Sequence, residues 1–271
     1  MLIGVGHQLS LLFPQPTAVT VMLHLHPSQA STIVSSDGLR IDPPVPVTEY
    51  IDLYGNRCNR LVAPAGRVTF SNSAVVRSDG LPDVQAVDAR QHLVQDLPDD
   101  TLIFLLASRY CDVDSELKAV ATQWFGHLIP GWSMVMAICN FTHRHIAFDY
   151  MQARANRTAL EAWRERKGVC RDYMHLAITL CRIMNIPARY CSGYLGDIGV
   201  PLHPPMDFSA WFEVFLGGRW YVFDARNNTP RIGRVLMTRG RDAADVALTT
   251  TFGDSKLDGF AVHTDELSAV G

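Results

Sequence analysis

Short apolar segments alternate with polar turn residues along the first hundred positions of the chain. The segments 17–25, 48–53 and 67–76 have the length and the β-branched content of strands. Clusters of Gly, Pro, Asn and Asp separate these segments. This pattern predicts an antiparallel β domain, either a sandwich or a barrel, which we place at residues 1–105.

The apolar positions change to helical spacing after the first domain, and we place a second, core domain at residues 106–254. Four helices are expected, in the ranges 115–129, 135–146, 158–166 and 170–186. Three strands are then expected, at 188–195, 210–216 and 219–223. Helices followed by an antiparallel sheet indicate an α+β core. Residues 255–271 are interpreted as a C-terminal tail or a strap over the surface.

The segment from Ser209 to Asp224 is the clearest hairpin of the chain. Gly217 and Gly218 suit a two-residue turn between two apolar strands. Counting back from this turn places Trp211 opposite Asp224, so that Ser209 and Asp224 share a face as diagonal neighbours. Taken alone, Asp224 would be a strand-end residue and Trp211 a core residue.

Composition narrows the class of protein. The chain has 271 residues, of which 48% are hydrophobic and 19% are charged, and its formal net charge is −3. The hydrophobic fraction argues against disorder, and the lack of a basic excess argues against nucleic acid as a partner. No apolar run is long enough to span a bilayer, and the N-terminus lacks the basic start of a signal peptide. We therefore expect a soluble, cytoplasmic protein with no membrane partner.

The six cysteines are scattered along the chain and contain no Cys-x-x-Cys pair. This spacing indicates neither a zinc ribbon nor a thioredoxin-type redox site. Cys139, His143 and His145 lie close together, but we interpret them as one helix face and its end rather than as a metal site. No metal or organic cofactor is expected.

Cys170 differs from the other cysteines in its position. It follows Gly168 and lies in the first turn of a predicted helix, off the apolar stripe of that helix. Unpaired backbone N–H groups and the positive end of the helix dipole favour a thiolate there. A thiolate attacks carbonyl groups. The alternative is a small buried residue, which is the role expected of the other five cysteines.

Several motifs resemble the bacterial transglutaminase-like core over about residues 110–253. They are Gly-Val-Cys-Arg-Asp at 168–172, Asn-Ile-Pro-Ala-Arg-Tyr at 185–190, Ala-Trp-Phe-Glu-Val at 210–214 and Asp-Ala-Arg at 224–226. The resemblance implies a papain-like cysteine core that follows a β-rich N-terminal region. Family members use a Cys-His-Asp triad, which implies that Cys170 is the nucleophile and Asp224 the orienting carboxylate. Trp211 and Tyr194 are then candidate substrate-binding residues.

The triad histidine of the family is replaced by Ser209, whose hydroxyl is too weakly basic to stand in for an imidazole. His203, in a Pro-rich loop, and His175 are candidate substitute bases. His175 lies five positions after Cys170, which corresponds to about 140° around a helix, so a direct contact with the thiol is not expected. Asp207 shares the face of Ser209 if the strand extends. A further alternative is that catalysis has been lost and the fold kept for binding.

The resemblance implies acyl transfer or hydrolysis at an amide or related carbonyl through a Cys170 thioester, as in a cysteine protease or acyltransferase. The expected substrate is a peptide or protein. Without a neighbouring base, a thiolate can form the thioester but protonates an amine leaving group poorly. We therefore expect ester, thioester or activated acyl chemistry to be favoured over peptide cleavage. The alternative function is a catalytically impaired binding or scaffold module.

Overall fold

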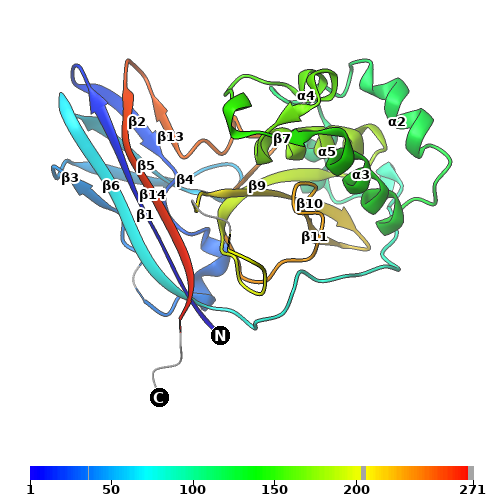
Figure 1. The fold of residues 1–271 in the computed structure, drawn as a ribbon, viewed down its shortest axis with the longest axis horizontal. Coiled ribbons are helices and arrows are strands. Elements are labelled where there is room, and N and C mark those ends of the chain that lie inside the picture. Colours follow the sequence, from blue (N-terminus) through cyan, green and yellow to red (C-terminus); the bar gives the residue numbers. More distant parts are fainter. Residues whose placement is uncertain (36, 203–205, 268–271) are drawn as a thin grey trace.

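The computed structural model describes residues 1–35, 37–202 and 206–267. A β sandwich occupies one side of the molecule, and a mixed helix and sheet unit occupies the other (Figure 1). The predicted α+β class is confirmed, and so is the order of an antiparallel β region followed by helices and a second antiparallel sheet. No helix in the described part of the chain has the length and hydrophobicity needed to cross a membrane.

The sandwich consists, within the described residues, of two four-stranded antiparallel sheets with the orders β14-β1-β6-β3 and β13-β2-β5-β4. Its elements are β1 (Leu2–Phe13), β2 (Thr17–Val21), η1 (Pro27–Thr32), β3 (Arg40–Asp42), β4 (Val47–Ile51), β5 (Arg57–Ala63), β6 (Gly66–Arg77), β13 (Thr249–Thr251) and β14 (Lys256–Leu267). Buried and exposed positions alternate along β6, and its inward side chains pack against those of β2 and β5 in one core.

Residues 256–267 form a strand, so their interpretation as a tail is wrong. β14 pairs antiparallel with β1 from Leu2–Leu267 to Leu12–Lys256 and forms an edge of the first sheet (Figure 1). Thr264 is its only buried residue. The strand therefore lacks the alternation of apolar and polar residues that indicates a half-buried strand in a sequence. Backbone pairing with β1, rather than side-chain burial, holds it in place.

The second unit is built around a sheet of order β11-β10-β9-β12. Its strands are β9 (Ala188–Leu195), β10 (Ser209–Leu216), β11 (Arg219–Phe223) and β12 (Arg234–Gly240), with a small pair β7 (Ala147–Phe148) and β8 (Lys167–Gly168). Its helices are η2 (Val94–Asp96), α1 (Asp99–Leu102), η3 (Ile103–Leu105), α2 (Leu117–Phe125), α3 (Trp132–His145), η4 (Tyr150–Gln152), α4 (Ala159–Glu165) and α5 (Cys170–Ile183). Helix α5 lies at the centre, in contact with α2, α3, α4, β9 and β10.

The predicted hairpin and the predicted starts of α4 and α5 are confirmed, whereas α3 begins three residues earlier than expected. Phe212 pairs with Phe223 across the hairpin, and both turn glycines, Gly217 and Gly218, have positive φ angles of 55° and 86°. This conformation is the one that a tight hairpin turn needs. At the start of α4, Thr158 and Glu161 each accept a hydrogen bond from the other's backbone N–H, which completes the expected capping box.

The sandwich and the second unit share a buried boundary. Tyr194 of β9, Phe208, and Val235 and Met237 of β12 belong to the same apolar cluster as the inner faces of the sandwich. The sheet of the second unit therefore packs on the sandwich through β9 and β12 and on helix α5 through β9 and β10. This arrangement buries Phe208, the residue directly before β10, in the shared core.

Candidate active site

A buried ion pair fixes the start of α5. Asp172 is fully buried, and its Oδ2 accepts hydrogen bonds of 2.8 Å from the Val169 N–H and of 2.8 Å from the Arg157 guanidinium. Arg157 is itself only 2% exposed. A Cβ atom on Gly168 would lie 2.5 Å from Asp172 Oδ2, so glycine is required at that position. The turn before Cys170 is therefore rigidly placed.

Cys170 is the first residue of α5 and is half-buried. Its side chain lines a cleft of about 460 Å³ that also contains Asp207, Ser209 and Arg226. The walls come from η4, from the segment before β10 and from the segment between β11 and β12. The cleft therefore brings the predicted nucleophile and the triad-histidine position to one place.

The thiol of Cys170 is neutral in this cleft at physiological pH. Burial raises its pKa to about 11; the Arg226 guanidinium opposes this rise, and Asp207 adds to it. Burial of the sulfur thus opposes the thiolate that the helix start was expected to favour. The loss of hydration destabilises the thiolate by more than the helix start and the Arg226 guanidinium stabilise it.

This pKa predicts how Cys170 responds to alkylation. Between pH 7 and pH 10 the rate of reaction with iodoacetamide should rise about tenfold per pH unit, because only the thiolate reacts. At pH 7.5 the rate should be below that of a small free thiol such as N-acetylcysteine. The measurement is the pH dependence of the labelled fraction of Cys170 by peptide mass spectrometry. A rate that is already constant above pH 7 would show a preformed thiolate and contradict this prediction.

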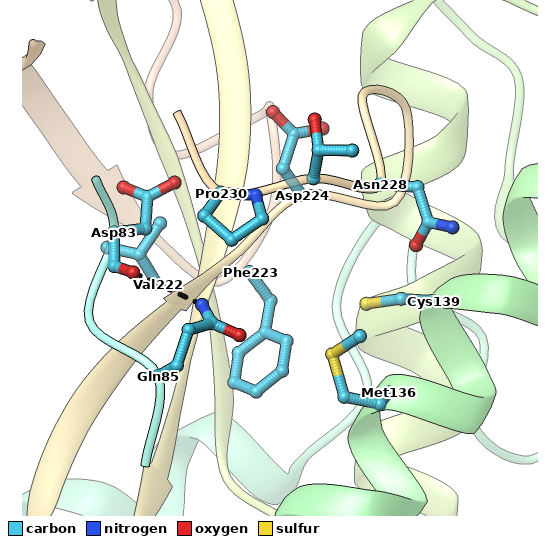
Figure 2. A pocket seen from close by; sticks show the side chains of 10 residues that line it. Asp83, Gln85, Met136, Cys139, Val222, Phe223, Asp224, Asn228 and Pro230 are labelled. Atoms are coloured by element: carbon cyan, nitrogen blue, oxygen red, sulfur yellow. Dashed lines mark hydrogen bonds between the residues drawn. The ribbon is translucent and has the colours of Figure 1, made fainter. Parts of the chain in front are cut away.

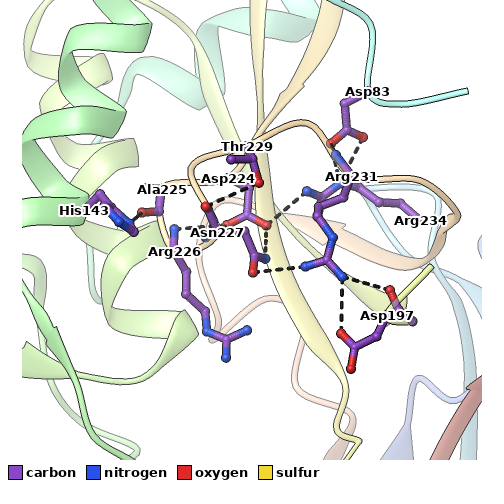
Figure 3. A network of polar contacts seen from close by, with 11 residues as sticks. Asp83, His143, Asp197, Asp224, Ala225, Arg226, Asn227, Thr229, Arg231 and Arg234 are labelled. Atoms are coloured by element: carbon purple, nitrogen blue, oxygen red, sulfur yellow. Dashed lines mark hydrogen bonds and ion pairs between the residues drawn. The ribbon is translucent and has the colours of Figure 1, made fainter. Parts of the chain in front are cut away.

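Ser209 opens β10, opposite Gly193 of β9, and lines the cleft. Asp224 directly follows β11 and lies outside the set of residues that line the cleft. Its Oδ1 accepts the backbone N–H groups of Arg226 at 3.0 Å and Asn227 at 2.9 Å. Its Oδ2 accepts the Asn227 side-chain amide at 2.7 Å and Arg234 Nη2 at 3.0 Å (Figure 3).

These four donors fill the acceptor positions of the Asp224 carboxylate. Arg234 thus supplies a cationic donor to the carboxylate that orients a histidine in a Cys-His-Asp triad. Arg234 is also held by Asp83, through Nε at 3.0 Å from both carboxylate oxygens. With serine at position 209, Asp224 stabilises the loop after β11 and forms an ion pair with Arg234.

A sequence profile of the Transglutaminase-like superfamily matches residues 120–225. A solved structure from Cytophaga hutchinsonii, described as a candidate cysteine protease, matches with a TM-score of 0.84 at 30% identity, over 99% of this chain and 91% of that chain. This chain belongs to the transglutaminase-like superfamily. An uncharacterised protein of Mycobacterium leprae is 27% identical over 215 residues, 73% of each chain. The periplasmic domain of TgpA from Pseudomonas aeruginosa matches at 15% identity with a TM-score of 0.41, over 83% and 90% of the two chains.

Two histidines were candidates to replace the triad base of this transglutaminase-like protein. His175 is fully buried, stacks on Tyr110 with ring centroids 5.1 Å apart, and accepts the Ala243 N–H on Nε2 at 3.2 Å. Burial lowers its pKa well below the usual value. It does not line the Cys170 cleft, so its role is in packing. His203 lies outside the described residues.

The two candidate substrate-binding aromatic residues lie in the interior. Trp211 is 2% exposed and packs with Cys191 and Leu236, and Tyr194 is 1% exposed and contacts His7 through its hydroxyl at 2.7 Å. Neither ring lines the Cys170 cleft. The prediction that they contact substrate is therefore wrong, and packing is the role that the structure gives them.

Cys139, His143 and His145 do not converge on one point in the structure. Cys139 is buried beside a small cavity of about 30 Å³ that Asp224 also lines (Figure 2). His143 Nδ1 contacts the Ala225 carbonyl at 3.2 Å, and His145 Nε2 contacts the Trp163 carbonyl at 2.7 Å. Within the described ranges, no three His, Cys, Asp or Glu side chains group as metal ligands.

Three charged or polar groups of the transglutaminase-like cleft were weakly indicated by the sequence, or not indicated at all. Asp207 lies close enough to affect the thiol, and burial raises its own pKa while Arg226 opposes that rise. Tyr150 of η4 lies near the same groups, and burial raises the pKa of its hydroxyl. Arg226 stood in the sequence only as part of the Asp-Ala-Arg motif. Its position two residues after Asp224 was the available signal.

Proposed function

We propose that this protein is a thiol-dependent acyltransferase or hydrolase that acts on a carbonyl group through a thioester at Cys170. The observation that carries the proposal is the position of Cys170, at the first residue of α5 and in the wall of an open cleft. The Arg171 N–H faces the sulfur at the helix start. Backbone N–H groups in this position are suited to stabilise the oxyanion of a tetrahedral intermediate.

The reaction follows from these groups. Cys170 gives up its proton, and its sulfur attacks the carbonyl carbon while the bond to the leaving group breaks. The leaving group takes up a proton, and water or an amine then attacks the thioester, which releases the acid or amide and restores the thiol.

We propose that Asp207, which lines the cleft and acts on the thiol through space, carries the proton in both directions. Its raised pKa brings a carboxyl group closer to the range in which it can accept and return a proton. Ester and thioester leaving groups need this help less than amines do. We therefore propose that they are favoured over simple peptide bonds. A peptide or protein is the proposed source of the acyl group, in line with the protease description of the Cytophaga hutchinsonii relative.

The test is acylation of the intact protein by an activated ester such as p-nitrophenyl acetate at pH 8 to 9. We expect one acetyl group at Cys170, with release of nitrophenol, and no adduct in the Cys170→Ala variant. The other five cysteines are buried and serve as an internal control. Equal nitrophenol release by Cys170→Ala would refute the proposal. Amide cleavage at the rate of ester cleavage would refute the preference for esters.

A binding module without catalysis is the second candidate. Two observations favour it: burial raises the pKa of the thiol to about 11, and Arg234 and Asn227 fill the Asp224 acceptor positions. In that case Cys170 should stay unacylated up to pH 9 in a protein whose circular dichroism spectrum is that of the folded chain.

A further inference from the structure

Two arginines line the Cys170 cleft, and they are held differently. Arg231 is paired, with Nη2 at 3.3 Å from Asp197 and at 2.9 Å from the Gly196 carbonyl. The Arg226 guanidinium extends away from this network (Figure 3). Its backbone N–H is bound by Asp224, but its side chain forms no hydrogen bond or ion pair within the described residues. Among the described residues, the Arg226 guanidinium is therefore a cation in the wall of the cleft with no hydrogen-bonded or ion-paired anion.

The position of the Arg226 guanidinium is defined by stacking. Its central carbon lies 4.4 Å from the centroid of the Phe148 ring. A cation over an aromatic face is held without consuming its N–H donors, so the planar fork stays available. The side chain is half-buried, and a guanidinium that is partly withdrawn from water gains most from a charged acceptor.

The anion that suits this fork is a carboxylate. A guanidinium binds a carboxylate through two parallel N–H···O bonds. Asp207 lies in the same cleft and acts on Arg226 through space without pairing with it. A nearby negative charge tolerates a monoanion better than the dianion of a phosphate. Tyr150 offers a further hydroxyl at the rim, where it is 53% exposed.

We infer that the acyl substrate of Cys170 carries a carboxylate and that Arg226 binds it. This inference deepens the proposed function and rests on it for the nature of the substrate. The C-terminal carboxylate or an acidic side chain of a peptide has the required chemistry. Arg226 also opposes the rise in the thiol pKa, so the anchor for the carboxylate and the nucleophile lie within electrostatic reach of each other.

The test compares an anionic and a neutral alkylating reagent on the full chain. Iodoacetate carries a carboxylate and iodoacetamide does not, and in both reactions the Cys170 thiolate displaces iodide. The ratio of their rates at Cys170 cancels the protonation state of the thiol. We expect this ratio to be about tenfold higher than for N-acetylcysteine, as a charge-assisted hydrogen bond predicts.

Variants assign this preference to Arg226. Arg226→Gln should reduce the ratio to the free-thiol value, whereas Arg226→Lys, which keeps the charge, should retain part of it. Arg144→Gln, an exposed arginine of α3 outside the cleft lining, should leave the ratio unchanged. Asp207→Asn should raise the ratio, because it removes a repelling charge. A wild-type ratio equal to that of the free thiol, or an unchanged ratio in folded Arg226→Gln, would overturn the inference.

Two further arms separate the outcomes. At equal ionic strength, acetate should slow iodoacetamide labelling of Cys170 more than inorganic phosphate does; stronger protection by phosphate would overturn the choice of carboxylate. The ratio does not depend on turnover. If the protein turns over esters but its iodoacetate-to-iodoacetamide ratio equals that of a free thiol, the carboxylate anchor is refuted and the proposed function stands. If the ratio is high but Cys170 is not acylated by esters, the anion site stands and the proposed function is refuted.

Discussion

Replacing Ser209 with histidine should raise the rate at which Cys170 is acylated by an activated ester by about 100-fold. General acid–base help contributes about 10²–10⁴-fold to such a step. An imidazole at position 209 would enter the cleft that Cys170 lines and accept its proton. We expect the lower end of the range, because Arg234 and Asn227 already fill the Asp224 carboxylate that would orient the ring. Nitrophenol release under single-turnover conditions measures the rate.

Ser209→Gln is the matched control, since glutamine has a similar length and does not titrate. It should leave the acylation rate close to that of the wild type. The gain in Ser209→His should follow a pH profile with an inflection near the pKa of an imidazole, and it should vanish in the Cys170→Ala background. An equal gain in Ser209→Gln would mean that shape, not base chemistry, limits the site, and would contradict the prediction.

Asp172→Asn should reduce the free energy of unfolding by about 3–5 kcal/mol. The variant keeps the shape of the side chain but removes the buried counter-charge of the Arg157 guanidinium, which is only 2% exposed, and leaves it paired with the more exposed Glu165 alone. It also weakens the acceptor for the Val169 N–H at the start of α5. Urea denaturation followed by circular dichroism measures the change.

The partner variant Arg157→Met should cost a similar amount, since it leaves a buried carboxylate alone. The double variant should cost clearly less than the sum of the two, because no unpaired charge remains. Asp114→Asn is the control: Asp114 is 79% exposed in its ion pair with Lys118, and its loss should change the stability little. Additive costs at Asp172 and Arg157 would show that the two side chains do not act as a pair.

Local patterns predicted the four longer helices, the hairpin and part of the sandwich, whereas strands such as β1, β5 and β12 were not predicted. Helical spacing and the Thr158–Glu161 capping box placed α4, and the Gly-Gly turn fixed the register of β10 and β11, because these signals are written within a few residues. β14 was missed because it contributes only Thr264 to the interior. Its place depends on hydrogen bonds to β1, a strand more than 240 positions away.

The candidate site was predictable in its parts and less so in its chemistry. Motif order and spacing placed Cys170 at a helix start and Ser209 in the same cleft. The protonation of the thiol was not predictable, since it depends on how far the folded chain removes Cys170 from water. Nor did the sequence indicate that Arg234, ten residues after Asp224, would occupy the carboxylate. Such contacts arise from loops whose paths no local pattern describes.

The pairing of β1 with β14 also sets the order in which the chain can be completed during synthesis. β1 is made more than 240 residues before β14 (Lys256–Leu267), which is one of its two neighbours in the sheet. Until then β1 has a row of unpaired backbone groups on that side, which is a template for wrong partners. The helices and the sheet that carry Cys170 are complete in sequence before this strand is made. The unit that carries Cys170 can therefore fold before β14 is made, and β14 then completes its sheet of the sandwich.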